Sequence, residues 1–86
     1  MTPKTIVKRR VVTKSISSDE GLRCVDIFRR EDNSFGFEEY RKDKETYEGW
    51  YKVHSYGYNV YLTEQEALTS AYNNVSWLKE KASNID

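Results

Sequence analysis

The feature that most constrains the fold is a pair of strand-like runs separated by four polar residues. Residues 22–30 (LRCVDIFRR) and 35–41 (FGFEEYR) are rich in branched and aromatic side chains, as β-strands are. The stretch between them, 31–34 (EDNS), is typical of a tight turn, because Asp and Asn side chains bond to their own backbone. A connection this short joins strands that run antiparallel. The two runs therefore predict a β-hairpin.

The segments on either side of this hairpin extend the sheet. Residues 49–54 (GWYKVH) predict a third strand of a meander, and residues 58–62 predict a short final one. Residues 5–16 (TIVKRRVVTKSI) are rich in β-branched side chains but do not separate into an apolar and a polar face. We expect either an edge strand or a loosely held arm there, because positive charge on an edge discourages unwanted pairing.

A helix is predicted after the strands. Thr63 and Glu66 match a capping box, in which the Thr63 side chain accepts from the Glu66 amide and the Glu66 side chain reaches back. Apolar side chains then recur every three or four residues, and they predict an amphipathic helix of about five turns: Ala67, Leu68, Ala71, Tyr72, Val75 and Leu78. One face of the sheet must cover this stripe. The sequence thus predicts an α+β fold, an antiparallel β-meander of three to five strands with one C-terminal amphipathic helix packed on one face. It leaves open which face.

The length of the chain bounds its organisation. Its 86 residues suffice for one domain. We divide it into a basic N-terminal arm or edge strand (1–16), a single α+β domain (17–82) and a frayed C-terminus (83–86). Apolar runs are too short to span a membrane, and no apolar leader is visible, so we expect a cytoplasmic protein without a membrane partner.

The residues needed for catalysis or metal binding are scarce. The only cysteine, Cys24, alternates with apolar residues and is expected in the core, and the only histidine, His54, ends a strand. Together they cannot supply the four ligands of a structural zinc site. Glu38 and Glu39 are neighbours on a strand, so they point to opposite faces, and we expect both to be solvated. The isolated glycines form no phosphate-binding loop. We therefore expect no enzyme, no cofactor and no metal site.

A charge asymmetry supports nucleic-acid binding as one hypothesis. Residues 1–14 hold five basic side chains and no acid, whereas the remainder holds nine basic and fourteen acidic ones. Residues 34–40 resemble part of the ribonucleoprotein motif of RNA-recognition domains, but Asn33, Ser34 and Glu38 depart from it. A generic site would use basic side chains for phosphates and exposed phenylalanines for stacking on bases: Lys4, Lys8, Arg9, Arg10, Lys14, Phe35 and Phe37. Alternatively, both phenylalanines belong to the core under the helix.

Binding to a protein partner, or to a second copy of the chain, is the hypothesis that we favour. An edge strand exposes backbone groups that can accept a strand from a partner. Tyrosine and tryptophan are common anchors in interfaces, and the candidates here are Trp50, Tyr51 and Trp77. The sequence therefore predicts a small non-catalytic interaction module, with a homodimer as one form that it can take.

A longer pattern resembles a group of small bacterial proteins of unknown function. The run 29–39 (RREDNSFGFEE) is similar to their RRxDxSFGFEE sequence, and a tryptophan (here Trp50), a loop and a helix ending in a VxWL-like element (here 75–78) follow it. The resemblance covers residues 24–78. It implies a bacterial cytoplasmic or phage-related origin, and it implies no activity, cofactor or catalytic residue.

Overall fold

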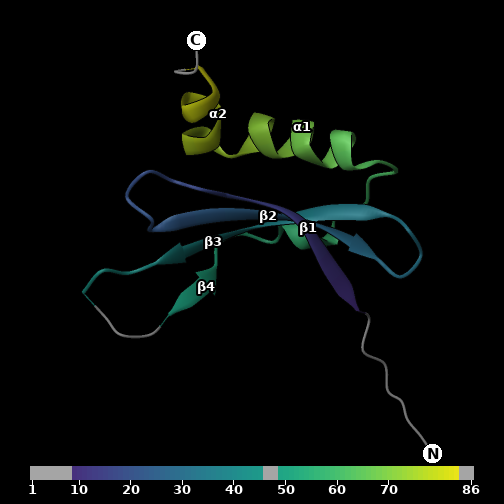
Figure 1. Cartoon of the computed structure of the whole chain (residues 1–86), viewed down its shortest axis with the longest axis horizontal. Helices are drawn as coiled ribbons and strands as arrows, with labels where there is room; N and C mark the ends of the chain where they lie inside the picture. The colour runs from purple at the N-terminus through teal and green to yellow at the C-terminus, as the bar shows by residue number, and fades with distance from the viewer. Residues whose placement is uncertain (1–8, 46–48, 84–86) are drawn as a thin grey trace, which may run out of the picture.

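Residues 9–45 and 49–83, which the computed structural model describes, form one antiparallel sheet with two helices on one of its faces (Figure 1). The strands lie in the order β1-β2-β3-β4. The elements in chain order are β1 (Arg10–Ser17), β2 (Arg23–Arg30), β3 (Phe35–Lys42), β4 (Trp50–Lys52), the 3₁₀ turn η1 (Tyr56–Tyr58), α1 (Glu64–Asn74) and α2 (Ser76–Ser83). This arrangement confirms the predicted α+β class and the antiparallel meander.

The hairpin between β2 and β3 is closed by the predicted turn. The Arg30 N–H donates to the Ser34 carbonyl (2.8 Å), and the Asn33 N–H donates to the Arg30 carbonyl (3.0 Å). Asn33 takes a φ of 70°, in the left-handed region that asparagine visits more readily than most residues. The Asp32 carboxylate accepts from the Ser34 hydroxyl (2.7 Å) and N–H (2.9 Å), and these bonds hold the pKa of Asp32 below its usual value. Local side chains therefore fix this turn.

The core lies between the helices and the sheet face that carries Phe37. This residue is fully buried and sits opposite Ile27 of β2. Its ring centroid lies 4.8 Å from that of Tyr56 and 6.1 Å from that of Tyr61. Further core side chains are at most 2% exposed: Val25, Ala67, Ala71, Val75 and Leu78. The helices thus cover the Phe35/Phe37 face, which answers the question that the sequence left open.

Neither α1 nor α2 lies on the opposite face (Figure 1). Phe28 lies on this face and is nevertheless only 2% exposed. Its ring fills the space above Gly36 of β3, where an added Cβ would come within 2.7 Å of the ring. The guanidinium carbons of Arg10 and Arg30 lie 4.2 Å and 5.0 Å from the ring centroid. Long arginine side chains therefore shield this face instead of a second helical layer.

Two helices stand where the sequence predicts one. The Glu66 N–H donates to Thr63 Oγ1 (3.0 Å), as predicted, but the Glu66 carboxylate accepts from the Leu62 N–H (3.1 Å) and not from Thr63. The continuous five-turn helix is wrong, because Val75 takes an extended conformation (φ −106°, ψ 106°) between α1 and α2. The Asn74 side chain donates to the Ser70 carbonyl (2.8 Å), a local bond of the kind that competes with helix propagation. Neither described helix is long and apolar enough to cross a membrane.

The predicted final strand at 58–62 is reduced to a single bridge. The Phe35 N–H donates to the Tyr61 carbonyl (2.8 Å), and the Tyr61 N–H donates back to the Phe35 carbonyl (2.9 Å). The chain also touches β3 earlier, where the Val53 N–H bonds to the Glu39 carbonyl (2.9 Å). Between these two points η1 leaves the line of the sheet. The segment 53–61 therefore contacts β3 at both of its ends but does not run beside it as a continuous strand.

Candidate functional site

The β1 edge, by which we mean Arg10–Ser17 and its outer side, is exposed along almost its whole length. Ile16 is half-buried, and every other residue of the strand is exposed. β1 pairs with β2 on one side, and no strand of the described residues pairs with it on the other. An edge of this kind presents backbone donors and acceptors to a partner.

The hydrogen bonds of the β1–β2 pair show which groups face outward. The Ser18 N–H donates to the Arg23 carbonyl (2.9 Å). Because these groups alternate along a strand, the backbone N–H and C=O of Ile16 point toward β2, and those of Ser15 and Ser17 point to the outer side. Lys81 of α2 donates to the Ser17 carbonyl (3.0 Å), so this outward acceptor is already hydrogen-bonded within the domain. The outer side thus remains accessible at Ser15 and before it.

The charge of the β1 edge is positive. Arg9 precedes the strand and Arg10 and Lys14 lie on it, whereas residues 9–17 include no acid. The predicted phosphate ligands Lys4 and Lys8 lie outside the described residues. A bulge between Val12 and Lys14 interrupts the register of the strand, a common device against unselective pairing. Both the positive charge and the bulge disfavour unselective pairing along this edge.

The stacking role predicted for Phe37 is wrong. An exposed ring is needed to stack on a base, and Phe37 is 0% exposed because the two helices cover it. Phe35 is half-buried and packs against the same core. The alternative reading of the two phenylalanines, as core residues under the helix, is the one that the structure confirms.

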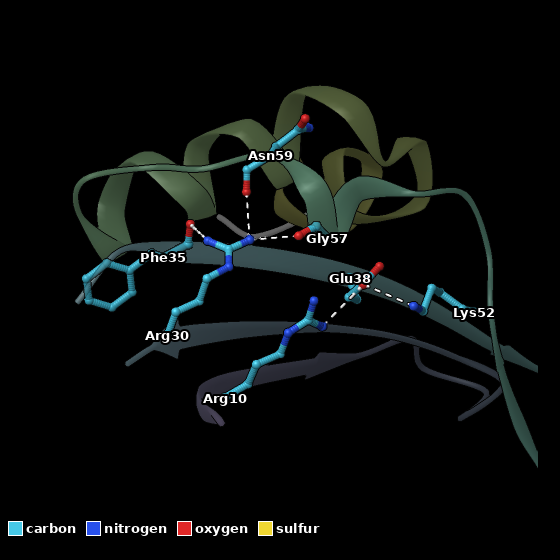
Figure 2. Close-up of polar contacts among 7 residues, drawn as sticks. All are labelled: Arg10, Arg30, Phe35, Glu38, Lys52, Gly57 and Asn59. Carbon is cyan, nitrogen blue, oxygen red and sulfur yellow. Dashed lines mark hydrogen bonds and ion pairs between the residues drawn. The ribbon is translucent and has the colours of Figure 1, made fainter. Parts of the chain in front are cut away.

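A buried carboxylate lies on the opposite sheet face. Glu38 is 2% exposed, and its Oε2 lies 3.4 Å from both Arg10 Nη1 and Lys52 Nζ (Figure 2). Its Oε1 has no hydrogen-bond partner among the described residues, and Gly57 packs directly against the carboxyl group. Glu39 is also buried, at 5% exposed. The expectation of two solvated glutamates is wrong, because neighbouring segments cover both sides of β3.

Arg30 ties the hairpin to the segment beyond β4 (Figure 2). Its guanidinium donates to the carbonyl oxygens of Phe35 (3.0 Å), Gly57 (2.7 Å) and Asn59 (3.0 Å), and to the Ser34 hydroxyl (3.2 Å). Two of these acceptors are 27 and 29 residues away in the sequence. Sequence reasoning missed this clamp, because no local pattern relates Arg30 to those carbonyls.

The three predicted interface aromatics lie in different environments. Trp50 and Tyr51 of β4 are 48% and 46% exposed. The Lys42 ammonium lies 5.8 Å from the Trp50 ring centroid. Trp77 is half-buried against the core, and its indole N–H donates to Glu39 Oε2 (3.0 Å). Trp50 and Tyr51 are therefore exposed at the surface, whereas Trp77 packs and hydrogen-bonds within the domain.

A second exposed surface was missed by sequence reasoning. Tyr58, Val60 and Leu62, which we call the apolar row, are 85%, 63% and 79% exposed. Tyr61, which lies between the last two, faces inward and bridges β3. Because β3 separates this segment from β2, the apolar row lies at the edge of the sheet opposite β1. Its signal in the sequence is apolar residues at alternate positions, which we interpreted as a strand.

Cys24 is not the core residue predicted. It is half-buried on the helix-free face, where its thiol lies 3.3 Å from Ser15 Oγ and 3.3 Å from Asp26 Oδ1. Burial is the main reason that the pKa of Cys24 is raised above its ordinary value, and Asp26 adds to the effect. This disfavours the thiolate that nucleophilic chemistry needs. In the described residues no cluster of three or more His, Cys, Asp or Glu side chains is placed to hold a metal ion.

Fold and surface together define a small α+β domain with an open, basic sheet edge and an apolar row at the other edge. No family model, curated protein or solved structure matches the chain.

Proposed function

We propose that this protein is a small, non-catalytic, cytoplasmic interaction module that binds an extended acidic segment of a partner protein along β1. The partner segment would add a fifth strand to the sheet. The observation that carries this proposal is the exposed β1 edge, with backbone groups directed outward at Ser15 and a positive charge along its length. Backbone hydrogen bonds supply affinity in such complexes, and side-chain charge supplies selectivity.

Charge favours an acidic partner strand over a second copy of β1. Arg9, Arg10 and Lys14 would be placed near the same three residues of a paired copy, and facing like charges are destabilising. Arg10 is partly neutralised by Glu38, whereas no such ion pair accompanies Arg9 or Lys14 among the described residues. Glutamate or aspartate at alternate positions of an added strand would complement them.

Nucleic-acid binding is the competing proposal for the same residues. Phosphates would meet the same basic side chains of the β1 edge. The loss of Phe37 as a stacking surface leaves this proposal with electrostatic contacts alone on β1. Such contacts depend steeply on salt and discriminate little between sequences. The two proposals therefore differ in what should bind at near-physiological salt.

Amide NMR of the labelled full chain tests the proposal directly. The probes are a peptide of alternating valine and glutamate of about ten residues, the matched valine–lysine peptide, and a single-stranded oligonucleotide. We expect saturable shifts at the amides of 11–15 with the acidic peptide and none with the basic one. Failure of the acidic peptide to shift these amides overturns the proposal. Tighter, salt-sensitive binding of the oligonucleotide would favour the competing one.

A proline substitution tests whether backbone pairing is the mode of binding. Ser15→Pro removes an outward N–H without removing a bond to β2, and proline is tolerated at strand edges of this kind. The matched control is Ser15→Ala, because Ser15 Oγ also bonds to Asp26 Oδ1 (2.7 Å) and both variants lose that bond. We expect Ser15→Pro to weaken the acidic peptide about tenfold relative to Ser15→Ala. Equal affinities would exclude strand addition at this position.

The charge term is tested separately with Arg9→Glu/Lys14→Glu, which leaves every backbone group in place. We expect this variant to lose the acidic peptide and to gain affinity for the valine–lysine peptide. Unchanged preference for the acidic peptide would contradict the proposed role of charge. A far-UV circular dichroism spectrum like that of the unmodified protein confirms that each variant is folded.

A further inference from the structure

Two arginines face each other across the sheet at the end where β2 begins and β3 ends, below α2 (Figure 1). Arg23 and Arg41 are register partners, so their Cβ atoms lie on the same face about 5 Å apart. That face carries the helices, because Val25 and Ile27 follow Arg23 at alternate positions and belong to the core. Tyr51 of β4 pairs with Arg41 on its other side and is 46% exposed. A row of two arginines and one tyrosine thus crosses three strands.

The two guanidinium groups lack a partner of opposite charge. Among the described residues, neither the Arg23 nor the Arg41 side chain forms an ion pair or a hydrogen bond. Arg23 is half-buried, so its charge is only partly solvated. Like charges directly opposite each other on neighbouring strands destabilise a sheet. An anion bound between the two groups would remove this repulsion.

The space around the arginine pair is a groove of about 390 Å³, a volume typical of small-ligand sites. Lys44 and Tyr51 line it together with the two arginines. Three exposed acids line it as well, and no ion pair joins them to either arginine: Glu20, Asp43 and Glu45. A long polyanion such as a nucleic acid would be repelled by these acids. A single compact anion can contact the two guanidinium groups alone.

We propose that this groove binds a small phosphate monoester, with the phosphate group between Arg23 and Arg41. A guanidinium presents parallel N–H donors that match two oxygens of a phosphate group. A carboxylate has two oxygens and one charge, which suffice for one arginine. A phosphate monoester has three acceptor oxygens and almost two charges, so it can complement both. The organic part of the ligand would lie toward the exposed Tyr51 ring, the next member of the row.

Amide NMR of the labelled full chain tests the inference. The probes are inorganic phosphate, phosphoserine and adenosine 5′-monophosphate, at constant ionic strength and above pH 7, where phosphate is almost fully charged. We expect saturable shifts at the amides of 22–24 and 41–45 with all three probes, and none with serine or adenosine. Both esters are expected to bind, and the tighter one identifies the source of the phosphate group. The absence of saturable shifts, or equal shifts with chloride, overturns the inference.

Substitution of one arginine tests whether the pair forms the site. Arg41→Gln should weaken phosphoserine binding at least about tenfold, and Arg41→Lys should also weaken it, because lysine keeps the charge but loses the parallel donors. The matched control is Arg29→Gln, which removes an exposed arginine from the same face of β2, about 20 Å along the strand. This control should bind like the unmodified chain. Equal affinities of Arg41→Gln and Arg29→Gln contradict the inference.

The repulsion between the two arginines gives a second measurement. Without phosphate, Arg41→Gln should raise the Tm by about 1–5 °C, because it removes one of two facing like charges. A lower Tm would show that the pair stabilises the fold and would contradict the argument. The inference does not depend on the function proposed for β1, since the valine–glutamate peptide should bind Arg41→Gln as it binds the unmodified chain.

Discussion

At the scale of single residues, Gly57 is the glycine at which an added Cβ would come closest to a neighbouring group. An added Cβ at Gly57 would overlap the Glu38 carboxyl group. Glu38 cannot easily move away, because it is 2% exposed and its Oε2 faces both Arg10 and Lys52 at 3.4 Å. Glycine at position 57 is therefore required by its neighbour across the sheet edge and not by an unusual backbone angle.

A double-mutant cycle measures this dependence. Gly57→Ala should lower the free energy of unfolding by about 1–3 kcal/mol, the usual cost of overpacking. In a Glu38→Ala background the same change should cost much less, because the group that the methyl meets is gone. Urea unfolding of the four proteins gives the coupling energy. Equal costs of Gly57→Ala in the two backgrounds would show that the methyl group meets something other than the carboxyl group.

At the scale of elements, the sequence predicted the features that depend on hydrogen bonds between residues close together in the chain. The turn at 31–34 and the cap at Thr63 could be predicted, because Asp32, Asn33 and Thr63 act on groups within a few residues. The helix break at Val75 could not, because apolar periodicity continues through it and both flanking segments bury their stripe. Periodicity reports which residues are buried. It does not report whether the backbone between them stays helical.

Some features of the candidate surfaces could likewise be predicted from the sequence, and others could not. The positive charge and edge position of β1 follow from its composition, since strand residues with many basic side chains suit an edge. The burial of Glu38 could not be predicted, because it depends on Arg10, Lys52 and Gly57 from three separate segments. The sequence predicts a strand at the apolar row, because alternation alone does not show whether a segment pairs with a neighbouring strand along its whole length.

The packing of α2 can be tested at this same scale. Leu78 lies after the break and close to the C-terminus, yet it is fully buried. Leu78→Ala should therefore lower the free energy of unfolding by about 2–5 kcal/mol, as a core truncation does. Trp77→Phe, which removes the indole N–H bond to Glu39 and keeps most of the ring, should cost about 0.5–1.5 kcal/mol. Thermal unfolding gives both values. A cost for Leu78→Ala below that for Trp77→Phe would show that α2 is not part of the core.

At the scale of the whole molecule, the β1 edge and the apolar row lie at opposite edges of one sheet. β2 and β3 separate the β1 edge from the segment that carries the apolar row, a separation of roughly 14 Å at 4.8 Å per strand spacing. β1 carries Arg10 and Lys14 and no acid, whereas β4 at the opposite edge carries Lys52, which pairs with Glu38.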